Sequence, residues 1–418
     1  MNRKIGNLFK GDKTIWIVFL FLCVISVVEV FSASSTLSYK TQNYMGPLIY
    51  HTSMIIFGLF VAIVILNIPC RYFKILTVPL LIISGIMLLW VLVGGESING
   101  ANRVIKVVGF TFQPSEIAKG SLVLATAQIL SAMQRMDGKG ADDKAMKYVL
   151  FITLPAIFFI GIENLSTACL IFGVIFLMLF IGRVPLIQLG KLMAAGGILV
   201  GVFFALVLTL GSFDGGDEAE QQTMVITDGQ AGSQNEIKGG GVFHRFATWR
   251  NRILNHSGGD DVAPEDYDME KNYQVGHANI AIASSNGIGK GPGNSTERDY
   301  LPQAFSDFIF AIIIEELGIF GAIFVVGLYV ILMFRCARIA GKCENNFPAF
   351  LVMGLGMLLV FQATINMLVA VGLFPVTGQP LPLISKGGTS TIINCAYIGM
   401  ILSVSRSAKQ SEQQLASE

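Results

Sequence analysis

The chain has 418 residues, of which 53% are hydrophobic and only 14% are charged, and its formal net charge is +1. A soluble domain of this length carries more charge and shorter apolar runs, so the composition excludes an ordinary soluble protein and indicates a helical membrane protein. The basic residues are dispersed through connecting segments and form no patch, which argues against nucleic acid as a partner.

Apolar segments long enough to cross a bilayer recur along the whole chain. They fall near residues 14–34, 47–68, 74–94, 115–134, 148–163, 165–182, 190–211, 306–334, 348–373 and 389–405. The expected fold class is therefore an all-α integral membrane protein with about ten transmembrane helices, forming a single domain over residues 1–418. The two segments beside Asn164 are short, so they are either two helices or one broken helix.

Lys and Arg are unevenly distributed among the segments that connect these helices. They are enriched at both ends of the chain and in the connections at 71–74, 135–147, 183–191 and 335–342. The positive-inside rule then places both termini in the cytoplasm. The first apolar run follows a basic start and lacks a small-residue cleavage site, so we expect it to be a retained helix.

Residues 212–305 then form a large extracytoplasmic loop before the eighth helix. Its first part, residues 214–241, is acidic and rich in Gly, which is typical of a mobile loop. Residues 242–254 place their apolar side chains on one helical face, which predicts an amphipathic helix on the outer leaflet. That helix, which carries Arg245, either anchors the loop to the membrane or contacts a headgroup phosphate.

The eighth predicted helix opens with a set of acidic residues. Ser306 is a good N-cap, Asp307 falls in the first turn, and Glu315 lies about 13 Å farther along the helix, near the bilayer centre. Carboxylates at that depth line a cavity or have a partner. Glu315 and Glu316 point to nearly opposite faces, so we expect one to support a cavity and the other to tie neighbouring helices.

The fourth predicted helix is preceded by residues 99–103 (NGANR) and opens with residues 113–119 (QPSEIAK). Pro114 is a natural first-turn residue, and Glu116 and Lys119 share one helical face. The two side chains form a buried structural ion pair, or else Lys119 joins Arg103 in holding a phosphate.

Two features near the C-terminus also carry polar groups. Gln362 and Asn366 lie four residues apart, which is typical of hydrogen bonding between helices. Residues 374–390 contain three prolines yet are apolar, so we expect non-helical backbone packed in protein or lining a wet cavity. In that run Gly387 and Gly388 permit close backbone approach, and Thr389 or Ser390 can cap the last helix. Lys386 either snorkels or contacts an anion.

Taken together, these motifs resemble the shape, elongation, division and sporulation family. They are NGAxR and QPSExxK before and in the fourth helix, GKGPGNS at 289–295, YLP at 300–302, SDFIF at 306–310, EELG at 315–318 and LPLISxGGTS at 381–390. The Gly-Asn-Ser at 293–295 is closer to the division branch than to the elongation branch. The resemblance implies a fold of ten transmembrane helices. It also implies an enzyme that polymerises lipid II into glycan strands at the outer face of the bacterial inner membrane.

The resemblance also implies roles for individual residues. Asp307 matches the essential family Asp. The substrate-binding residues that we propose lie on the matching motifs, except for Arg245. They are Arg103, Gln113, Glu116, Lys119, Arg245, Lys290, Ser295, Lys386, Gly387, Gly388 and Thr389. Four positions depart from the family pattern: Val104, Asn164, His277 and Lys386.

Glycan polymerisation needs a base for the acceptor hydroxyl and cations for the leaving pyrophosphate. Our hypothesis is that Asp307 is the general base of an inverting transfer and that Arg103, Lys119 and Arg245 bind the pyrophosphate. Mg²⁺ or Mn²⁺ could share that task with Asp307 or Glu116 as ligand, although no metal motif is visible.

The expected partners are lipid II, a class B penicillin-binding protein transpeptidase and other divisome membrane proteins at the septum. The alternatives are an elongation-type polymerase, a lipid II flippase and a division scaffold without chemistry.

Overall fold

The computed structural model describes residues 10–34, 45–94, 96–98, 101–107, 110–135, 140–210, 273–302 and 304–415. The amphipathic helix predicted at 242–254, with Arg245, lies outside these ranges.

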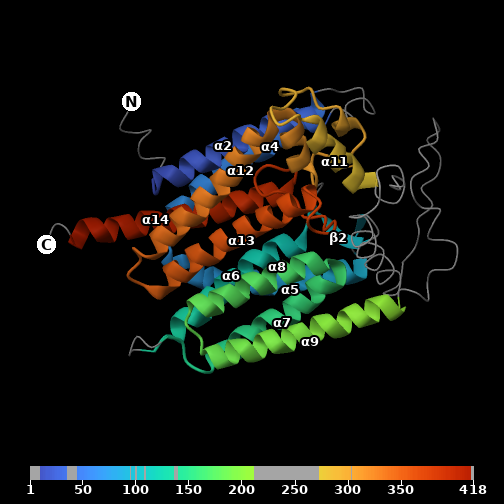
Figure 1. Ribbon diagram of the computed structural model, residues 1–418. Helices are drawn as coiled ribbons and strands as arrows, with labels where there is room; N and C mark the ends of the chain where they lie inside the picture. Colours follow the sequence, from blue (N-terminus) through green and yellow to red (C-terminus); the bar gives the residue numbers. More distant parts are fainter. Residues whose placement is uncertain are drawn as a thin grey trace.

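Long apolar helices lie side by side in one bundle (Figure 1). They are α2 (Lys13–Ala33), α4 (Gly46–Asn67), α5 (Arg71–Gly94), α6 (Pro114–Ala132), α7 (Ala145–Glu163), α8 (Leu165–Ile181), α9 (Leu186–Leu210), α12 (Ile309–Ala340), α13 (Asn346–Ala370) and α14 (Thr389–Leu415). Each apolar segment predicted from the sequence coincides with one of them to within four residues, except that α12 and α14 end six and ten residues later than predicted. Among the described residues, six helices are long and apolar enough to cross a membrane, and the chain is an integral membrane protein.

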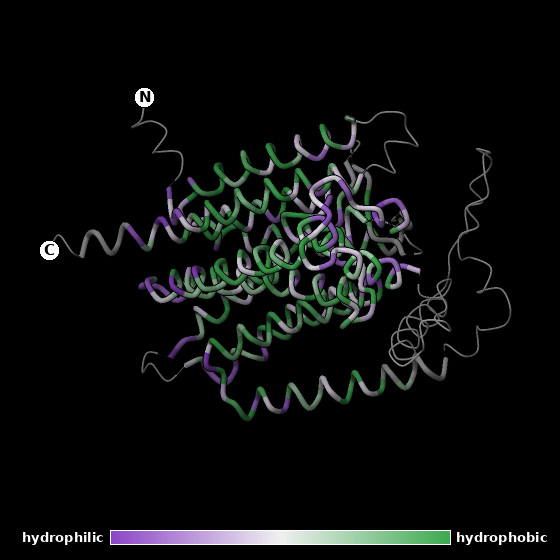
Figure 2. The backbone as a smooth tube through the Cα atoms, turned by 45° about the horizontal axis from the view of Figure 1, so that its top comes forward, coloured by the Kyte–Doolittle hydropathy of each residue, from purple (hydrophilic) through white to green (hydrophobic). Residues whose placement is uncertain are grey.

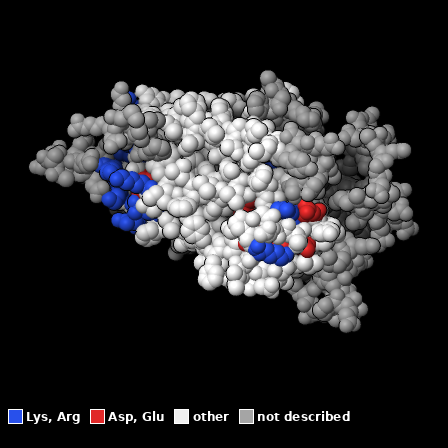
Figure 3. Space-filling view, turned by 90° about the horizontal axis from the view of Figure 1, so that it is seen from above, with Lys and Arg blue, Asp and Glu red and all other residues white. Residues whose placement is uncertain are grey.

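The bundle has two distinct ends. α2 begins and α14 ends at one of them, which we call the termini end, whereas the short helix α11 (Tyr273–Ser284) and the strands lie at the opposite end, which we call the site end (Figure 1). Hydrophobic residues dominate the helix middles (Figure 2), and charged side chains gather toward the two ends (Figure 3). This distribution suits a bundle whose middle lies in hydrocarbon.

α7 and α8 form a hairpin, so the alternative of one broken helix is wrong. The amide of Ala141, before α7, donates to the carbonyl of Gly182, after α8, at 3.2 Å, which brings the outer ends of the two helices together. Asn164 lies at the turn between them, at the site end, and accepts a hydrogen bond from the Thr167 amide as the N-cap of α8. An Asn side chain can cap a helix in this way, which explains the break.

A small antiparallel sheet at the site end makes the all-α prediction incomplete. It consists of β1 (Glu96–Ile98), β2 (Ala101–Val107) and β3 (Phe110–Phe112), in that order, with Ser97 opposite Asn102 and Ile105 opposite Phe112. β3 leads directly into α6, whose N-cap position is Gln113 and whose first residue is Pro114, as predicted. The sheet therefore fixes the entry of the helix that carries Glu116 and Lys119.

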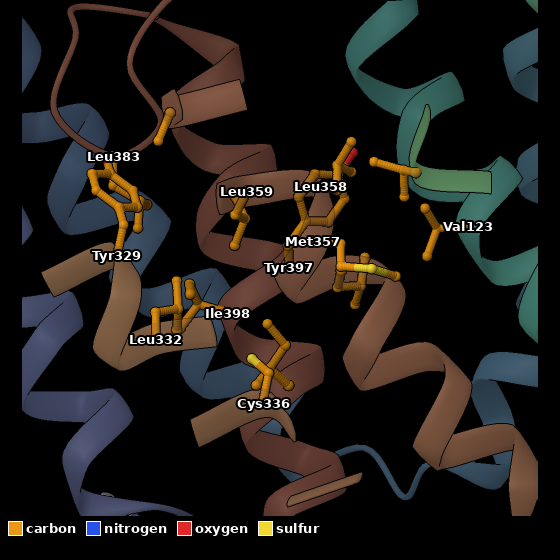
Figure 4. Close-up of a cluster of buried hydrophobic side chains, with 14 of the residues drawn as sticks. Val123, Tyr329, Leu332, Cys336, Met357, Leu358, Leu359, Leu383, Tyr397 and Ile398 are labelled. Atoms are coloured by element: carbon orange, nitrogen blue, oxygen red, sulfur yellow. The ribbon is translucent and has the colours of Figure 1, made fainter. Parts of the chain in front are cut away.

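The centre of the bundle is a hydrophobic core shared by α6, α12, α13 and α14 (Figure 4). Its side chains include Val123, Leu332, Cys336, Met357, Leu358, Leu359 and Ile398, all of them buried. Leu383 reaches this cluster from the loop after α13, so a non-helical segment penetrates the bundle. Burial of these side chains supplies the packing that holds that loop in place.

α12 is interrupted at Gly318, whose φ of 69° and ψ of −167° are open only to glycine. Residues 287–289 approach this point closely, and an added Cβ at Gly289 would lie 2.4 Å from the Glu316 carbonyl oxygen. The carbonyl of Gly287 also accepts a hydrogen bond from the Ile319 amide at 3.0 Å. The break therefore depends on two glycines that are far apart in sequence.

The chain folds back at Gly318. After it, α12 runs antiparallel to α2, with Phe324 against Phe21 and Arg335 bonded to Asp12 at the termini end. The packing of α12 against α13 shows how deep in the bundle the residues before Gly318 lie.

Gly356 of α13 packs on Cys336, and Asn366, about 15 Å farther toward the site end, bonds the Asp307 carbonyl. Asp307 thus lies at the level of the residues near 326, deeper than Gly318, and Glu315 lies at the site end. The prediction that Glu315 lies deeper in the membrane than Asp307 is therefore wrong, because it assumed a continuous helix through Gly318.

We expect Gly318→Ala to lower the unfolding free energy by about 3 kcal/mol, because strained backbone and overpacking each contribute about 1–3 kcal/mol. A Cβ at Gly318 would lie 2.4 Å from the Ile288 carbonyl carbon. Gly327 lies in the regular part of the same helix with no atom within 4 Å of an added Cβ, so Gly327→Ala is the matched control. Thermal unfolding in detergent measures both, and equal midpoints for the two variants would contradict the strain argument.

Candidate functional site

The turn at residues 304–308 carries Asp307 and leads into α12. The helix begins at Ile309 with Phe308 at its N-cap, so the prediction that Ser306 caps the helix and Asp307 lies in its first turn is wrong. Ser306 instead donates from Oγ to Oδ1 of Asp307 at 3.0 Å. The segment stays out of the helix because its carbonyls accept hydrogen bonds from other elements.

Three consecutive carbonyls in this turn each accept a hydrogen bond from a group outside it. The Lys386 amide donates to the Phe305 carbonyl at 2.9 Å, and Ser385 Oγ donates to the Ser306 carbonyl at 2.6 Å. Asn366 Nδ2 donates to the Asp307 carbonyl at 2.8 Å. Residues 305–307 are half-buried, and carbonyls withdrawn from water need such partners. The backbone that carries Asp307 is therefore fixed from two sides, by α13 and by the loop that follows it.

That loop, residues 371–388, is non-helical and its inner part is buried, which confirms the prediction of irregular backbone packed in protein. Side chains from three helices donate to its carbonyls. They are Ser26 of α2 to Ile384, Tyr329 of α12 to Pro382 and Gln362 of α13 to Pro380. Because prolines cannot donate backbone hydrogen bonds, the surrounding helices satisfy this loop through its carbonyls.

Glu116 and Lys119 form an ion pair in the interior of the bundle. Lys119 Nζ lies 2.7 Å from Glu116 Oε1 and 2.6 Å from Gln362 Oε1, and the Lys119 side chain is fully buried. These contacts are those of the structural ion pair considered above. A role for Lys119 or Glu116 in substrate binding stays a prediction.

Gln362 bonds Lys119 of α6, which confirms for this residue the predicted hydrogen bonding between helices, whereas Asn366 bonds two carbonyls outside the helices. Asn366 Nδ2 donates to the Gln379 carbonyl at 2.7 Å as well as to Asp307. Gln379 Nε2 donates in turn to Thr167 Oγ1 at 2.5 Å, at the start of α8. Hydrogen bonds thus connect α8 to the turn of Asp307.

Glu315 and Glu316 both hold the loop at residues 287–299. Glu315 accepts hydrogen bonds from Lys290 Nζ at 2.5 Å, from the Thr296 amide at 3.0 Å and from Ser295 Oγ. Charge-assisted bonds of this kind are strong. A predicted substrate contact through Lys290 or Ser295 remains untested, but both side chains are engaged in securing this loop.

Glu316 binds the same loop from its own side. It accepts from the Gly293 amide at 2.8 Å and from Ser32 Oγ of α2, and Arg298 Nη1 lies 4.0 Å from it. The expectation that one of the two glutamates ties neighbouring helices is confirmed for Glu316, which accepts a hydrogen bond from Ser32 of α2. A cavity supported by Glu315 stays a prediction. Both lie just before the break at Gly318, where the loop wraps around the end of the helix.

The last predicted motif lies beside the Asp307 turn. Lys386 Nζ lies 4.8 Å from the centre of the Phe305 ring, and burial lowers the pKa of its ammonium group. Gly388 has φ of 50°, and an added Cβ at Gly387 would lie 2.1 Å from Ser390 Oγ. α14 begins at Thr389, so Thr389 and Ser390 lie in its first turn.

The structure places the remaining predicted residues only in part. Gln113 is half-buried and its carbonyl accepts from the Glu116 amide at 3.1 Å. Arg103 lies in β2, but its side chain is outside the described part, as is all of Arg245. Their proposed contacts with a pyrophosphate stay predictions.

Sequence reasoning missed several residues that complete this site. Ser385 belongs to the recognised motif and Gln379 lies just before it, but neither had an assigned role, and Glu29 was overlooked altogether. Glu29 is fully buried in α2, and neither of its carboxylate oxygens has a hydrogen-bond partner among the described residues. An acidic residue inside the apolar run at 14–34 was the available signal.

Within the described residues, no three His, Cys, Asp or Glu side chains come together as a metal site. A divalent cation held by Asp307 or Glu116 remains a prediction. In the part of the chain that the structure describes, the second carboxylate oxygen of Glu116 is buried without a hydrogen-bond partner, so it is the oxygen that could serve such an ion.

This chain is similar to known proteins over most of its length. A family profile described as "Cell cycle protein" (FtsW/RodA/SpoVE) matches residues 12–222 and 242–410. Proteins named "Probable peptidoglycan glycosyltransferase FtsW" are similar over most of their length. The one from Trichlorobacter lovleyi is 29% identical over 97% of this chain and 96% of its own, and the one from Aliivibrio salmonicida is 30% identical over 93% and 87%.

Solved structures share the fold. A chain of a peptidoglycan synthase complex that coordinates polymerization and crosslinking has a TM-score of 0.67 at 23% identity, covering 96% of this chain and 99% of that one. The rod shape determining protein RodA of Thermus thermophilus has a TM-score of 0.60 at 23% identity, with 96% and 98% covered. The chain belongs to the FtsW/RodA/SpoVE family of cell cycle proteins.

Proposed function

We propose that the chain is a peptidoglycan glycosyltransferase that polymerises lipid II into glycan strands during septal cell-wall synthesis. Family membership and the names of its relatives support this activity. The observation that carries the site assignment is the turn of Asp307, whose carbonyl and those of the two preceding residues each have a donor on another element. A carboxylate held on a fixed backbone is what general base catalysis requires.

In the proposed reaction, Asp307 accepts the proton of the acceptor sugar hydroxyl. The hydroxyl oxygen attacks the anomeric carbon of the donor from the face opposite the leaving group, and the bond from that carbon to the undecaprenyl pyrophosphate breaks, which inverts the centre. Arg103, Lys119 and Arg245 neutralise the pyrophosphate charge. Mg²⁺ or Mn²⁺, when bound, would add charge neutralisation there.

The proposed placement in the membrane follows the distribution of basic residues. Ten helices cross the bacterial inner membrane, both termini lie in the cytoplasm, and residues 212–305 lie outside, so that the site end faces the exterior. Asp307, which lies below the level of Gly318, would then act on lipid-linked sugars that reach it from the outer leaflet. A class B penicillin-binding protein transpeptidase is the proposed partner, with other divisome proteins at the septum.

Synthesis from purified components tests the function. The chain, with and without the partner transpeptidase, is incubated with lipid II in detergent and in vesicles, and products are resolved by electrophoresis. We expect glycan strands. Transbilayer movement of lipid II without strands would indicate a flippase, and neither activity would indicate a scaffold.

A further inference from the structure

We propose that Asn366 is a positioning residue for the transfer reaction, acting through Asp307. It lies one turn before the end of α13 and is buried, with 1% of its surface exposed. Its amide nitrogen donates to the Asp307 carbonyl at 2.8 Å and to the Gln379 carbonyl at 2.7 Å. The inference rests on the proposed function, since it assigns a role through the proposed base.

The chemistry of the asparagine amide suits this position. Nδ2 carries two hydrogens, and each has one acceptor, so a single planar group joins the turn of Asp307 to the loop after α13. Asn366 is buried, so a side chain without a donor at this position would leave the buried Gln379 carbonyl unpaired. Leucine has a similar volume but no donor, and would leave both carbonyls without this partner.

Asn366 is also the point at which a longer set of buried hydrogen bonds reaches Asp307. Gln379, whose carbonyl Asn366 holds, donates to Thr167 at the start of α8. One turn earlier on α13, Gln362 bonds the neighbouring Pro380 carbonyl and Lys119 of α6. These hydrogen bonds fix the position of the proposed base relative to three packed helices. A shift of about 1 Å in a catalytic group can lower a rate by about 10²-fold.

The test is Asn366→Leu in the full-length chain with its partner, assayed with lipid II as substrate. We expect kcat to fall by about 10- to 100-fold while KM for lipid II changes less than about twofold, because the base is displaced and the lipid site is not. The matched control is Thr364→Val. Thr364 is an exposed residue of α13 whose hydroxyl donates to the Val360 carbonyl of its own helix, and we expect parental kinetics for it.

Stoichiometric binding of lipid II to each variant shows that the protein is folded, which separates positioning from a merely structural role. If Asn366→Leu is not recovered folded, Asn366→Gln, which keeps both hydrogens but moves them by one methylene, carries the same comparison. Parental kcat, or a raised KM with unchanged kcat, would overturn the proposal. Full activity of Asp307→Asn would instead reject the base assignment itself.

Discussion

Purified Asp307→Asn is expected to polymerise lipid II at about 10²- to 10⁴-fold below the parental rate, the range that a general base contributes. Asparagine keeps the size of the side chain and can still interact with Ser306, which now donates to Asp307 Oδ1. The backbone bond from Asn366 is unaffected because it ends on the carbonyl. The substitution therefore removes the proton acceptor with little effect on folding.

The measurement is the initial rate of strand formation at saturating lipid II. Asp143→Asn is the control, because Asp143 is exposed and pairs only at the surface with Arg135, an interaction worth about 0–1 kcal/mol. Unchanged synthesis by Asp307→Asn would show that another group, or the substrate itself, accepts the proton.

Lys119→Met is expected to lower the unfolding free energy by about 3–5 kcal/mol, since it leaves the buried Glu116 carboxylate without its cation. It also removes a donor from Gln362. Adding Glu116→Gln removes the uncompensated charge, so the double variant should recover most of the lost stability. Thermal unfolding in detergent compares the parent, the single variant and the double variant.

The double variant also decides between the two readings of this pair. If Lys119 binds the donor pyrophosphate, lipid II affinity stays low after stability returns. If the pair is only structural, affinity returns together with stability. A Lys119→Met protein that unfolds at the parental midpoint would contradict the structural account.

The helical bundle could be predicted from the sequence because hydrophobic length is a local property. The sheet was missed although residues 99–100 (Asn-Gly) lie beside β-branched residues at 104–108, a pattern typical of a hairpin. The break in α12 could not be read at Gly318, which lies in an apolar run like many membrane glycines. Its partner, Gly289, is distant in sequence.

The candidate site could also be predicted from the sequence only in part. Asp307, Glu116 and Lys119 were found through motifs of side chains. The bonds that fix Asp307 end on backbone carbonyls, which every residue has, so no residue type marks them. The common loop bound by Glu315 and Glu316 was missed because the angle between neighbouring side chains on a helix does not tell how a long loop wraps around its end.

The contact between the 287–299 loop and the first part of α12 is reciprocal. The helix supplies two carboxylates and the carbonyls of Glu315 and Glu316, and the loop supplies the side-chain and amide donors that satisfy them. Neither segment could separate without stranding buried polar groups on the other. The loop and the first part of α12 should therefore unfold as one cooperative unit. In that unit the short helix after Asp307 is no more stable than the loop that packs against it.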